Sequence, residues 1–209
     1  MWYHDFMIKN HKTSFLALVR HGQSEWNAMG MWTGDTDVGL SAKGREEARV
    51  AARMLAAIPF DYAYTSQLAR AIETLDIMLA EMKRTDIPVT RYPALNERQY
   101  GIYTGKLKED VKKQLGEDAY RSIRRGWDHP IEDGESLKDV HKRVVAFFRE
   151  EVLPRLASGH DVLIVSHGNA MRALAKELEG IADDEIIHLE MKTAEIWLYE
   201  YKDGKFSKK

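Results

Sequence analysis

Two histidines each follow a short apolar run, and each is directly followed by a glycine. His21 comes soon after the run 15–19, and His167 soon after the run 162–165. Such runs are typical of buried parallel strands, and open α/β sheets bind ligands at the carboxyl ends of these strands. If the two strands are neighbours, His21 and His167 lie side by side, and the glycines allow a ligand to approach closely.

The residue types around these histidines favour phosphoryl transfer. A neutral imidazole is nucleophilic at physiological pH and can carry a phosphoryl group, which splits one transfer into two steps. We therefore predict His21 as the covalent nucleophile and His167 as a group that stabilises the transferring phosphoryl. Arg20 and Arg70 offer planar donor forks to its oxygens, in place of a metal ion. Glu97 is the candidate proton donor, with a pKa that burial would raise and the arginines would lower.

Each of these residues has a commonplace alternative. A histidine at a strand end is usually structural, an arginine is usually a surface ion-pair residue, and Glu97 could cap a helix. The stretch 35–37 carries two aspartates, as magnesium-dependent phosphatases do, but it does not follow an apolar strand. The combination of residues, rather than any one of them, favours the phosphohistidine reading.

Hydrophobic spacing predicts the elements that must position these side chains. In the first half we expect a helix capped by Ser41 and ending at Pro59, a strand at 60–64, a helix over 68–79 and a strand at 87–92. In the second half we expect a long helix from Ser136 to about 154–159, a strand at 162–165, a helix from Asn169 to Gly180, a strand at 194–201 and a polar tail over 202–209.

The stretch from about 96 to 134 breaks this regular pattern. Glycines interrupt short charged helical pieces there, and Arg124 and Arg125 lie close to Arg121. Loops and insertions of this kind often carry function, so we predict a lid over the site. We expect one domain over 1–209, with an N-terminal extension over 1–14.

The composition excludes several classes of protein. The 209 residues contain 31 Lys and Arg against 33 Asp and Glu, a net charge of −2, which disfavours nonspecific binding to nucleic acid or to a membrane surface. The absence of cysteine excludes disulfides, thiolate zinc sites and cysteine nucleophiles, and fits a cytoplasmic protein. No apolar stretch approaches the ~20 residues of a membrane span. No nucleotide or metal motif is present, so we expect no metal.

The segment 18–27, Leu-Val-Arg-His-Gly-Gln-Ser-Glu-Trp-Asn, resembles the signature of the histidine phosphatase superfamily, in particular its 2,3-bisphosphoglycerate-dependent phosphoglycerate mutase branch. The resemblance continues through 33–34, 40–41, 66–71, 95–101, 134–136 and 167–174, and so covers about 15–200. It implies an α/β fold of three layers, αβα, with a mostly parallel central sheet and a lid insertion.

The same resemblance implies residue roles. His21 would be phosphorylated, Glu97 would donate and accept the proton, and His167 would stabilise the transition state, while Arg20, Asn27 and Arg70 hold the phosphoryl group. A clamp for a three-carbon acid has matching positions at Gln23, Ser24, Thr33, Gly34, Arg98, Tyr100, Lys108, Arg124, Arg125, Gly168 and Asn169.

The implied reaction is the interconversion of 3-phosphoglycerate and 2-phosphoglycerate in glycolysis and gluconeogenesis, primed by 2,3-bisphosphoglycerate and without a metal. The partner would be a small phosphorylated three-carbon acid, and family members often form homo-oligomers. A broad phosphomonoesterase and a catalytically silent phospho-ligand binding module remain alternatives.

Three departures from the mutase pattern bear on the substrate. Lys106 could compete with Lys108 for the clamp, Asp35 stands where a tryptophan is usual, and the stretch 193–196 replaces a turn that usually contains glycine and proline.

Overall fold

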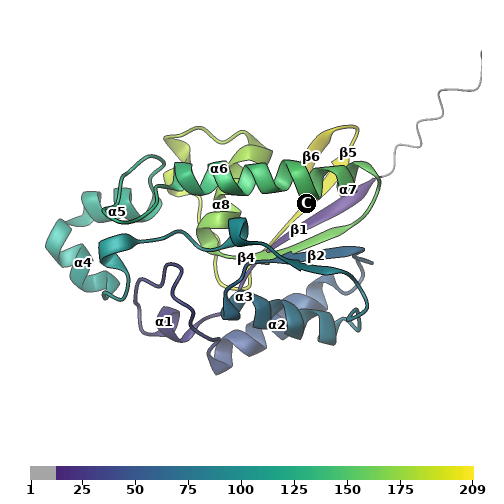
Figure 1. Cartoon of the computed structure of the whole chain (residues 1–209), viewed down its shortest axis with the longest axis horizontal. Helices are drawn as coiled ribbons and strands as arrows, with labels where there is room; N and C mark the ends of the chain where they lie inside the picture. The colour runs from purple at the N-terminus through teal and green to yellow at the C-terminus, as the bar shows by residue number, and fades with distance from the viewer. Residues whose placement is uncertain (1–12) are drawn as a thin grey trace, which may run out of the picture.

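The computed structural model describes residues 13–209, in which one six-stranded sheet is covered by helices on both faces (Figure 1). The strand order is β3-β2-β4-β1-β5-β6. The parallel strands are β1 (Ser14–Arg20), β2 (Tyr62–Thr65), β3 (Val89–Arg91) and β4 (Val162–Ser166), and the antiparallel pairs add β5 (Ile196–Lys202) and β6 (Lys205–Lys208). The predicted α/β class and mostly parallel sheet are confirmed.

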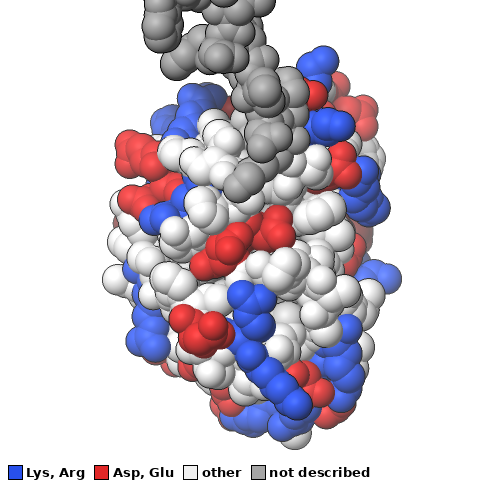
Figure 2. Space-filling model, turned by 90° about the vertical axis from the view of Figure 1, so that its right-hand side faces the viewer, with Lys and Arg blue, Asp and Glu red and all other residues white. Residues whose placement is uncertain are grey.

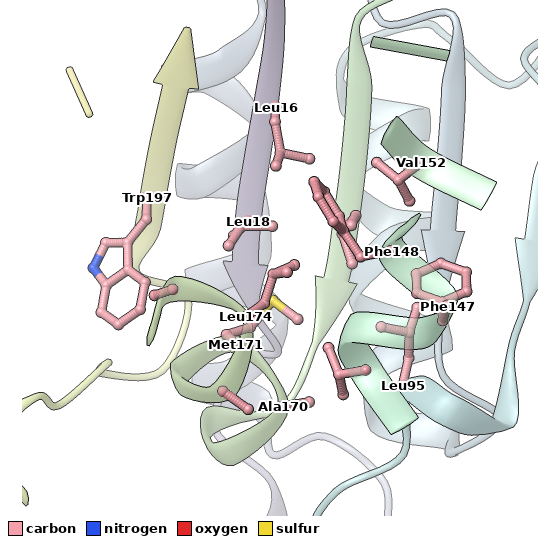
Figure 3. Close-up of a cluster of buried hydrophobic side chains, with 14 of the residues drawn as sticks. Leu16, Leu18, Leu95, Phe147, Phe148, Val152, Ala170, Met171, Leu174 and Trp197 are labelled. Atoms are coloured by element: carbon pink, nitrogen blue, oxygen red, sulfur yellow. The ribbon is translucent and has the colours of Figure 1, made fainter. Parts of the chain in front are cut away.

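The two faces of the sheet carry separate apolar cores. Along β1, Leu16 and Leu18 pack on one side and Ala17 and Val19 on the other, because successive side chains of a strand alternate between faces. The first core also contains residues of α6 (Leu137–Phe147), α7 (Leu153–Ala157) and α8 (Gly168–Glu179), and Figure 3 shows it. The second contains residues of α2 (Ala42–Leu55) and α3 (Ala69–Glu81). These layers hold the strand ends rigidly.

The predicted serine caps begin α2 and α6. Ser41 Oγ accepts a hydrogen bond from the Gly44 N–H at the start of α2. Ser136 and Asp139 form a reciprocal capping box at the start of α6. The long helix predicted from Ser136 is not uniform: a π-helix at Phe148–Val152 separates α6 from α7. Pro154, in the first turn of α7, has no N–H to continue a regular ladder.

The chain end differs from the predicted polar tail. Residues Lys205–Lys208 form β6, which pairs with β5 in a hairpin. The turn residues Asp203 and Gly204 both have positive φ, 53° and 79°. An Asp-Gly pair with this conformation is a frequent two-residue hairpin turn, and its twist matches that of the strands. The prediction of a tail over 202–209 was therefore wrong, and the Asp-Gly pair was the signal that it missed.

The start of the chain also needs a correction. The predicted extension over 1–14 lies outside the described residues up to residue 12, but Ser14 is the first residue of β1. Its hydroxyl donates to the Leu156 carbonyl, 2.9 Å away. Within residues 13–209, no helix is both long and apolar enough to cross a membrane.

The 96–134 segment lies beyond the carboxyl ends of the parallel strands (Figure 1). After the 3₁₀ turn Pro93–Leu95, it contains the 3₁₀ turn Gly101–Tyr103, α4 (Lys108–Leu115) and α5 (Glu117–Arg125). A small apolar cluster of its own joins it to the stretch after α1 (Glu25–Ala28); the cluster comprises Trp32, Val111, Tyr120, Ile123 and Ile131. The segment is thus packed against the main body next to the strand ends.

Candidate active site

His21 and His167 lie side by side at the carboxyl ends of β1 and β4. The two strands pair in parallel, with Arg20 opposite Ser166, so the next residue of each is a histidine at the same sheet edge. The ring centroids are 5.0 Å apart. Both side chains are buried, at 2% and 0% exposure. The predicted juxtaposition is confirmed, because parallel pairing brings both strand ends to one edge.

The His21 ring is held in the form that a nucleophile needs. Its Nδ1 lies 2.6 Å from the Gly22 carbonyl oxygen, which can only accept a hydrogen bond. Nδ1 therefore carries the ring proton, and Nε2 keeps a free lone pair. Burial, with the charges of Arg70 and Arg20, holds the pKa of His21 well below its usual value. The ring is therefore neutral at physiological pH.

His167 presents an unsatisfied nitrogen. Its Nε2 lies 2.7 Å from Ser66 Oγ, and that hydroxyl, which accepts from the Leu68 N–H, can donate its own proton to the imidazole. In this arrangement the ring proton is on Nδ1, which is buried without a partner. Burial and Arg70 hold the pKa of His167 well below its usual value. A phosphoryl oxygen would satisfy this donor.

Backbone carbonyls fix the two arginines beside the histidines. Arg20 Nη1 donates to the Met191 carbonyl at 2.7 Å. Arg70, at the start of α3, donates to the carbonyls of Thr36 and Gly34 at 2.8 and 2.7 Å. Arg70 is 1% exposed, so its charge is held in place in a site from which water is largely excluded.

The glycine after His21 is required by close packing within the protein, whereas the glycine after His167 is not. A Cβ on Gly22 would lie 2.2 Å from the Gly44 carbonyl oxygen, so Gly22 lets the start of α2 approach the nucleophile loop. A Cβ on Gly168 would lie 3.4 Å from Arg20 Nε. From the sequence we expected Gly22 to allow the close approach of a ligand. The structure shows instead that Gly22 allows the close approach of α2.

Glu97 faces the same pocket from the start of the 96–134 segment. Its Oε1 accepts from the Arg98 N–H at 2.8 Å and from the Asn169 backbone and side-chain N–H groups at 3.3 and 3.2 Å. Asn169 Nδ2 also lies 2.7 Å from the Tyr100 hydroxyl. These contacts fix the carboxyl group in the pocket that His21 also lines.

The pocket is strongly cationic. Its lining comprises Arg20, His21, Asn27, Met31, Trp32, Thr33, Gly34, Arg70, Glu97, Tyr100, Lys108, Arg124, Arg125, Gly168 and Asn169, which include five Arg and Lys side chains and one carboxylate. At the opposite end of the molecule, by contrast, acidic and basic side chains are interspersed (Figure 2). The positive charge is therefore local, as the nearly balanced composition requires.

Unpaired polar atoms gather at this pocket. Among residues 13–209, six buried side-chain nitrogen or oxygen atoms lack a hydrogen-bond partner. Three of them, Arg20 Nε, Trp32 Nε1 and Thr33 Oγ1, belong to lining residues. A fourth, Nδ1 of the predicted catalytic residue His167, lies outside the lining, on a ring 5.0 Å from that of His21. Buried polar groups are rarely left unpaired, so an anion with several acceptor oxygens fits here.

The 96–134 segment contributes the cations Lys108, Arg124 and Arg125 to the lining, and this part of the pocket is here called its far end. Lys108 begins α4, and Arg124 and Arg125 end α5. Burial, with the charges of Arg124, Arg20 and Arg125, lowers the pKa of Lys108 to about 8. Lys106, the alternative to Lys108, instead lies over the Tyr103 ring at 5.7 Å and is absent from the lining.

Three of the predicted substrate residues lie outside the lining. Gln23 accepts from the Ser41 hydroxyl at 2.9 Å, and Ser24 caps α1 in a capping box with Asn27. Arg98 is fully buried and donates to the carbonyls of residues 123, 129 and 135. In this structure these side chains shape the surroundings of the pocket.

Sequence reasoning assigned no role to Arg172, Met31 or Trp32. Arg172 is fully buried in α8 and donates to Asn169 Oδ1 at 2.8 Å, which orients the Asn169 amide toward Glu97. It also donates to the carbonyls of residues 125, 186 and 189. Its position in the 167–174 motif was the available signal, but its partners lie far away along the chain.

The arrangement defines a class of protein. A buried neutral histidine with a free Nε2, a second histidine, two fixed arginines and a carboxyl group can accept and return a phosphoryl group. The chain belongs to the histidine phosphatase superfamily (branch 1), whose family model matches residues 16–209.

Two relatives within this superfamily carry the same enzyme name. The chain is 43% identical over 192 residues to a Parvibaculum lavamentivorans protein named 2,3-bisphosphoglycerate-dependent phosphoglycerate mutase, and the alignment covers 91% of each chain. It is 39% identical over 215 residues to a Lactiplantibacillus plantarum protein named 2,3-bisphosphoglycerate-dependent phosphoglycerate mutase 2, with 90% of this chain and 94% of the relative covered.

Solved structures share the fold. A putative alpha-ribazole-5'-P phosphatase from Escherichia coli superposes with a TM-score of 0.77 at 25% identity, with 94% of each chain covered. A mycobacterial glucosyl-3-phosphoglycerate phosphatase superposes with a TM-score of 0.80 at 24% identity, with 94% of this chain and 97% of that chain covered, and that likeness concerns the fold alone.

Proposed function

We propose that this chain is a 2,3-bisphosphoglycerate-dependent phosphoglycerate mutase, which interconverts 3-phosphoglycerate and 2-phosphoglycerate through phospho-His21. The observation that carries the proposal is one pocket lined by His21 and by two groups of cations. Arg20 and Arg70 lie beside His21, and Lys108, Arg124 and Arg125 line the far end. A ligand with one phosphoryl group at the histidine and further anionic groups beyond it matches this distribution of charge.

His21, the arginines and Glu97 divide the transfer step between them. His21 Nε2 attacks phosphorus, the N–P bond forms as the ester P–O bond breaks, and Glu97 gives a proton to the leaving oxygen. In the return step an acceptor hydroxyl attacks phospho-His21 and gives its proton to Glu97. Arg20, Arg70 and His167 hold the oxygens of the transferring group, where each lost donor would cost about 2.7–4 kcal/mol, by analogy with an oxyanion hole.

The pocket has donors that fit the proposed priming cofactor. The unpaired Arg20 Nε, Thr33 Oγ1 and His167 Nδ1 are suited to phosphoryl oxygens. When bound, 2,3-bisphosphoglycerate would supply the phosphoryl group that first loads His21. The far-end cations Lys108, Arg124 and Arg125 would hold its other anionic groups and so retain it for transfer back.

A phosphomonoesterase would use the same histidine but would let water attack the phosphoenzyme. This alternative has support in the 25% identity to the Escherichia coli chain described as a phosphatase. The far-end cations favour the mutase, because a three-carbon acid held at both ends reorients without leaving.

A coupled mutase assay with and without 2,3-bisphosphoglycerate, on wild type and His21→Ala, tests the proposal. We expect 2-phosphoglycerate formation that depends on the bisphosphate and is lost in His21→Ala. Activity that ignores the bisphosphate or survives the substitution would contradict the mechanism. Phosphate release that equals substrate loss, with no 2-phosphoglycerate, would favour the phosphatase.

The proposal also includes a substrate class, a pathway, a location and an oligomeric state. The substrate would be a small phosphorylated three-carbon acid, and the pathway glycolysis and gluconeogenesis in the cytoplasm. We keep a homo-oligomer as an expectation from the family, which size-exclusion chromatography with light scattering would test.

A further inference from the structure

One carboxylate outside the pocket lining contacts both arginines at its far end. Glu190 Oε1 forms an ion pair with Arg125 Nη2 and lies 3.7 Å from Arg124 Nη2. Both arginines line the pocket, whereas Glu190 does not. The guanidinium groups that would hold the far anionic group of a ligand are therefore already engaged by an anion of the protein.

The backbone around Glu190 is fixed by two other arginines. The Leu189 carbonyl accepts from Arg172 Nε at 2.8 Å, and the Met191 carbonyl accepts from Arg20 Nη1 at 2.7 Å. Glu190 thus lies between two anchored carbonyl groups, and the position of its Cα relative to the end of α5 is set by buried contacts. The approach of its carboxylate to Arg124 and Arg125 follows from this fixed backbone.

The charges of the pocket explain why an extra carboxylate is stabilising there. The lining has five Arg and Lys side chains and only Glu97 as a carboxylate. Mutual repulsion of these cations contributes to the lowered pKa of Lys108. Glu190 offsets part of that repulsion while no ligand is bound.

The pair is also accessible enough to be exchanged. The side chain of Glu190 is 56% exposed, that of Arg124 36% and that of Arg125 15%. Because more than half of the Glu190 side chain is exposed, water screens its ion pairs, so a carboxylate or phosphate of a ligand can displace Glu190 at modest cost.

We infer that Glu190 is a competing internal anion that limits the affinity of the pocket for ligands with a second anionic group. It releases Arg124 and Arg125 only to a ligand group of the same charge. A phosphomonoester with an uncharged tail leaves the pair with Glu190 intact and is unaffected. This inference rests on the proposed function for the identity of the natural ligand, but not for the competition itself.

The test compares two ligands that differ in the second anionic group. Isothermal titration at constant ionic strength measures Kd for 3-phosphoglycerate and for glycerol 3-phosphate, on the full chain with His21→Ala to prevent phosphoryl transfer. Glu190→Gln is added to this background. Because the ion pair is exposed, we expect Kd for 3-phosphoglycerate to fall about two- to fivefold, with little change for glycerol 3-phosphate.

A matched control is Glu185→Gln, which removes the same charge from an exposed position five residues earlier. It should leave both Kd values unchanged. Weaker or unchanged binding of 3-phosphoglycerate in Glu190→Gln would overturn the inference, as would equal tightening for both ligands or the same shift in Glu185→Gln. Selective tightening in the His21→Ala background, together with no mutase turnover by the wild type, would contradict the proposed function alone.

Discussion

The two ends of the pocket are built in different ways. At the phosphoryl end, His21 and His167 follow neighbouring buried strands, and carbonyl groups hold Arg20 and Arg70. At the far end, the cations come from α4 and α5, outside the sheet, and are more exposed. In the proposed function this difference separates two tasks: the sheet would preorganise the chemistry, and the 96–134 segment would select the ligand.

The largest expected effect is at the nucleophile. His21→Asn should lower mutase activity by about 10⁴–10⁶-fold, the range found when a covalent nucleophile or its partner is removed. The matched control is His141→Gln, at a half-buried histidine whose Nε2 lies 3.2 Å from Glu177. Steady-state assays should find His141→Gln close to wild type, and a similar loss in both variants would contradict the assignment.

The next effect is at the proton donor. Glu97→Gln should lower mutase turnover by about 10²–10⁴-fold, because the leaving or attacking oxygen loses its acid and base. The initial burst of p-nitrophenol from p-nitrophenyl phosphate, which reports phosphorylation of His21, should fall much less, since its phenolate leaves without a proton. Equal losses with both substrates would show that Glu97 acts on the structure of the site rather than on proton transfer.

The far end should affect binding more than chemistry. Arg125→Met should raise KM for 3-phosphoglycerate about 10–100-fold, from the loss of about 1.5–3 kcal/mol of hydrogen bonding to a charged group. KM and kcat for p-nitrophenyl phosphate should change little, because that ligand has no second anionic group. A comparable rise in KM for both substrates would contradict the assignment of separate tasks to the two ends of the pocket.

The smallest effect is a pH dependence. The pKa of Lys108 is about 8, below that of an ordinary lysine, so its charge is present below pH 8 and is lost above it. We expect kcat/KM for 3-phosphoglycerate to fall by up to about tenfold between pH 7 and 9. Lys108→Arg keeps its charge and should flatten this decline. An unchanged pH profile in Lys108→Arg would assign the decline to another group.

The same contrast explains what the sequence could predict. His21 and His167 each follow an apolar run, and parallel pairing of those strands was enough to bring them together. The far-end residues could be predicted only from the resemblance to a family. The spacing of the residues does not show which of Lys106 and Lys108 turns toward the pocket. The structure places Lys108 in the lining and Lys106 against Tyr103.

Other features depend on contacts that no local pattern encodes. Arg98 and Arg172 look like ordinary helix or loop arginines, yet both are fully buried and donate to carbonyls of distant segments. Gly22 is explained by the approach of Gly44, which follows from how α2 packs. The hairpin at Asp203 and Gly204, by contrast, was encoded locally and was missed.

The central claim is that His21 carries the phosphoryl group on Nε2. Its most direct test is to mix the protein with 2,3-bisphosphoglycerate, quench in alkali and locate the phosphate by peptide mass spectrometry and ³¹P NMR. Because Nδ1 donates to the Gly22 carbonyl, we expect phosphate on His21 at Nε2. Phosphate on Nδ1, on another residue, or on no residue at all would contradict it.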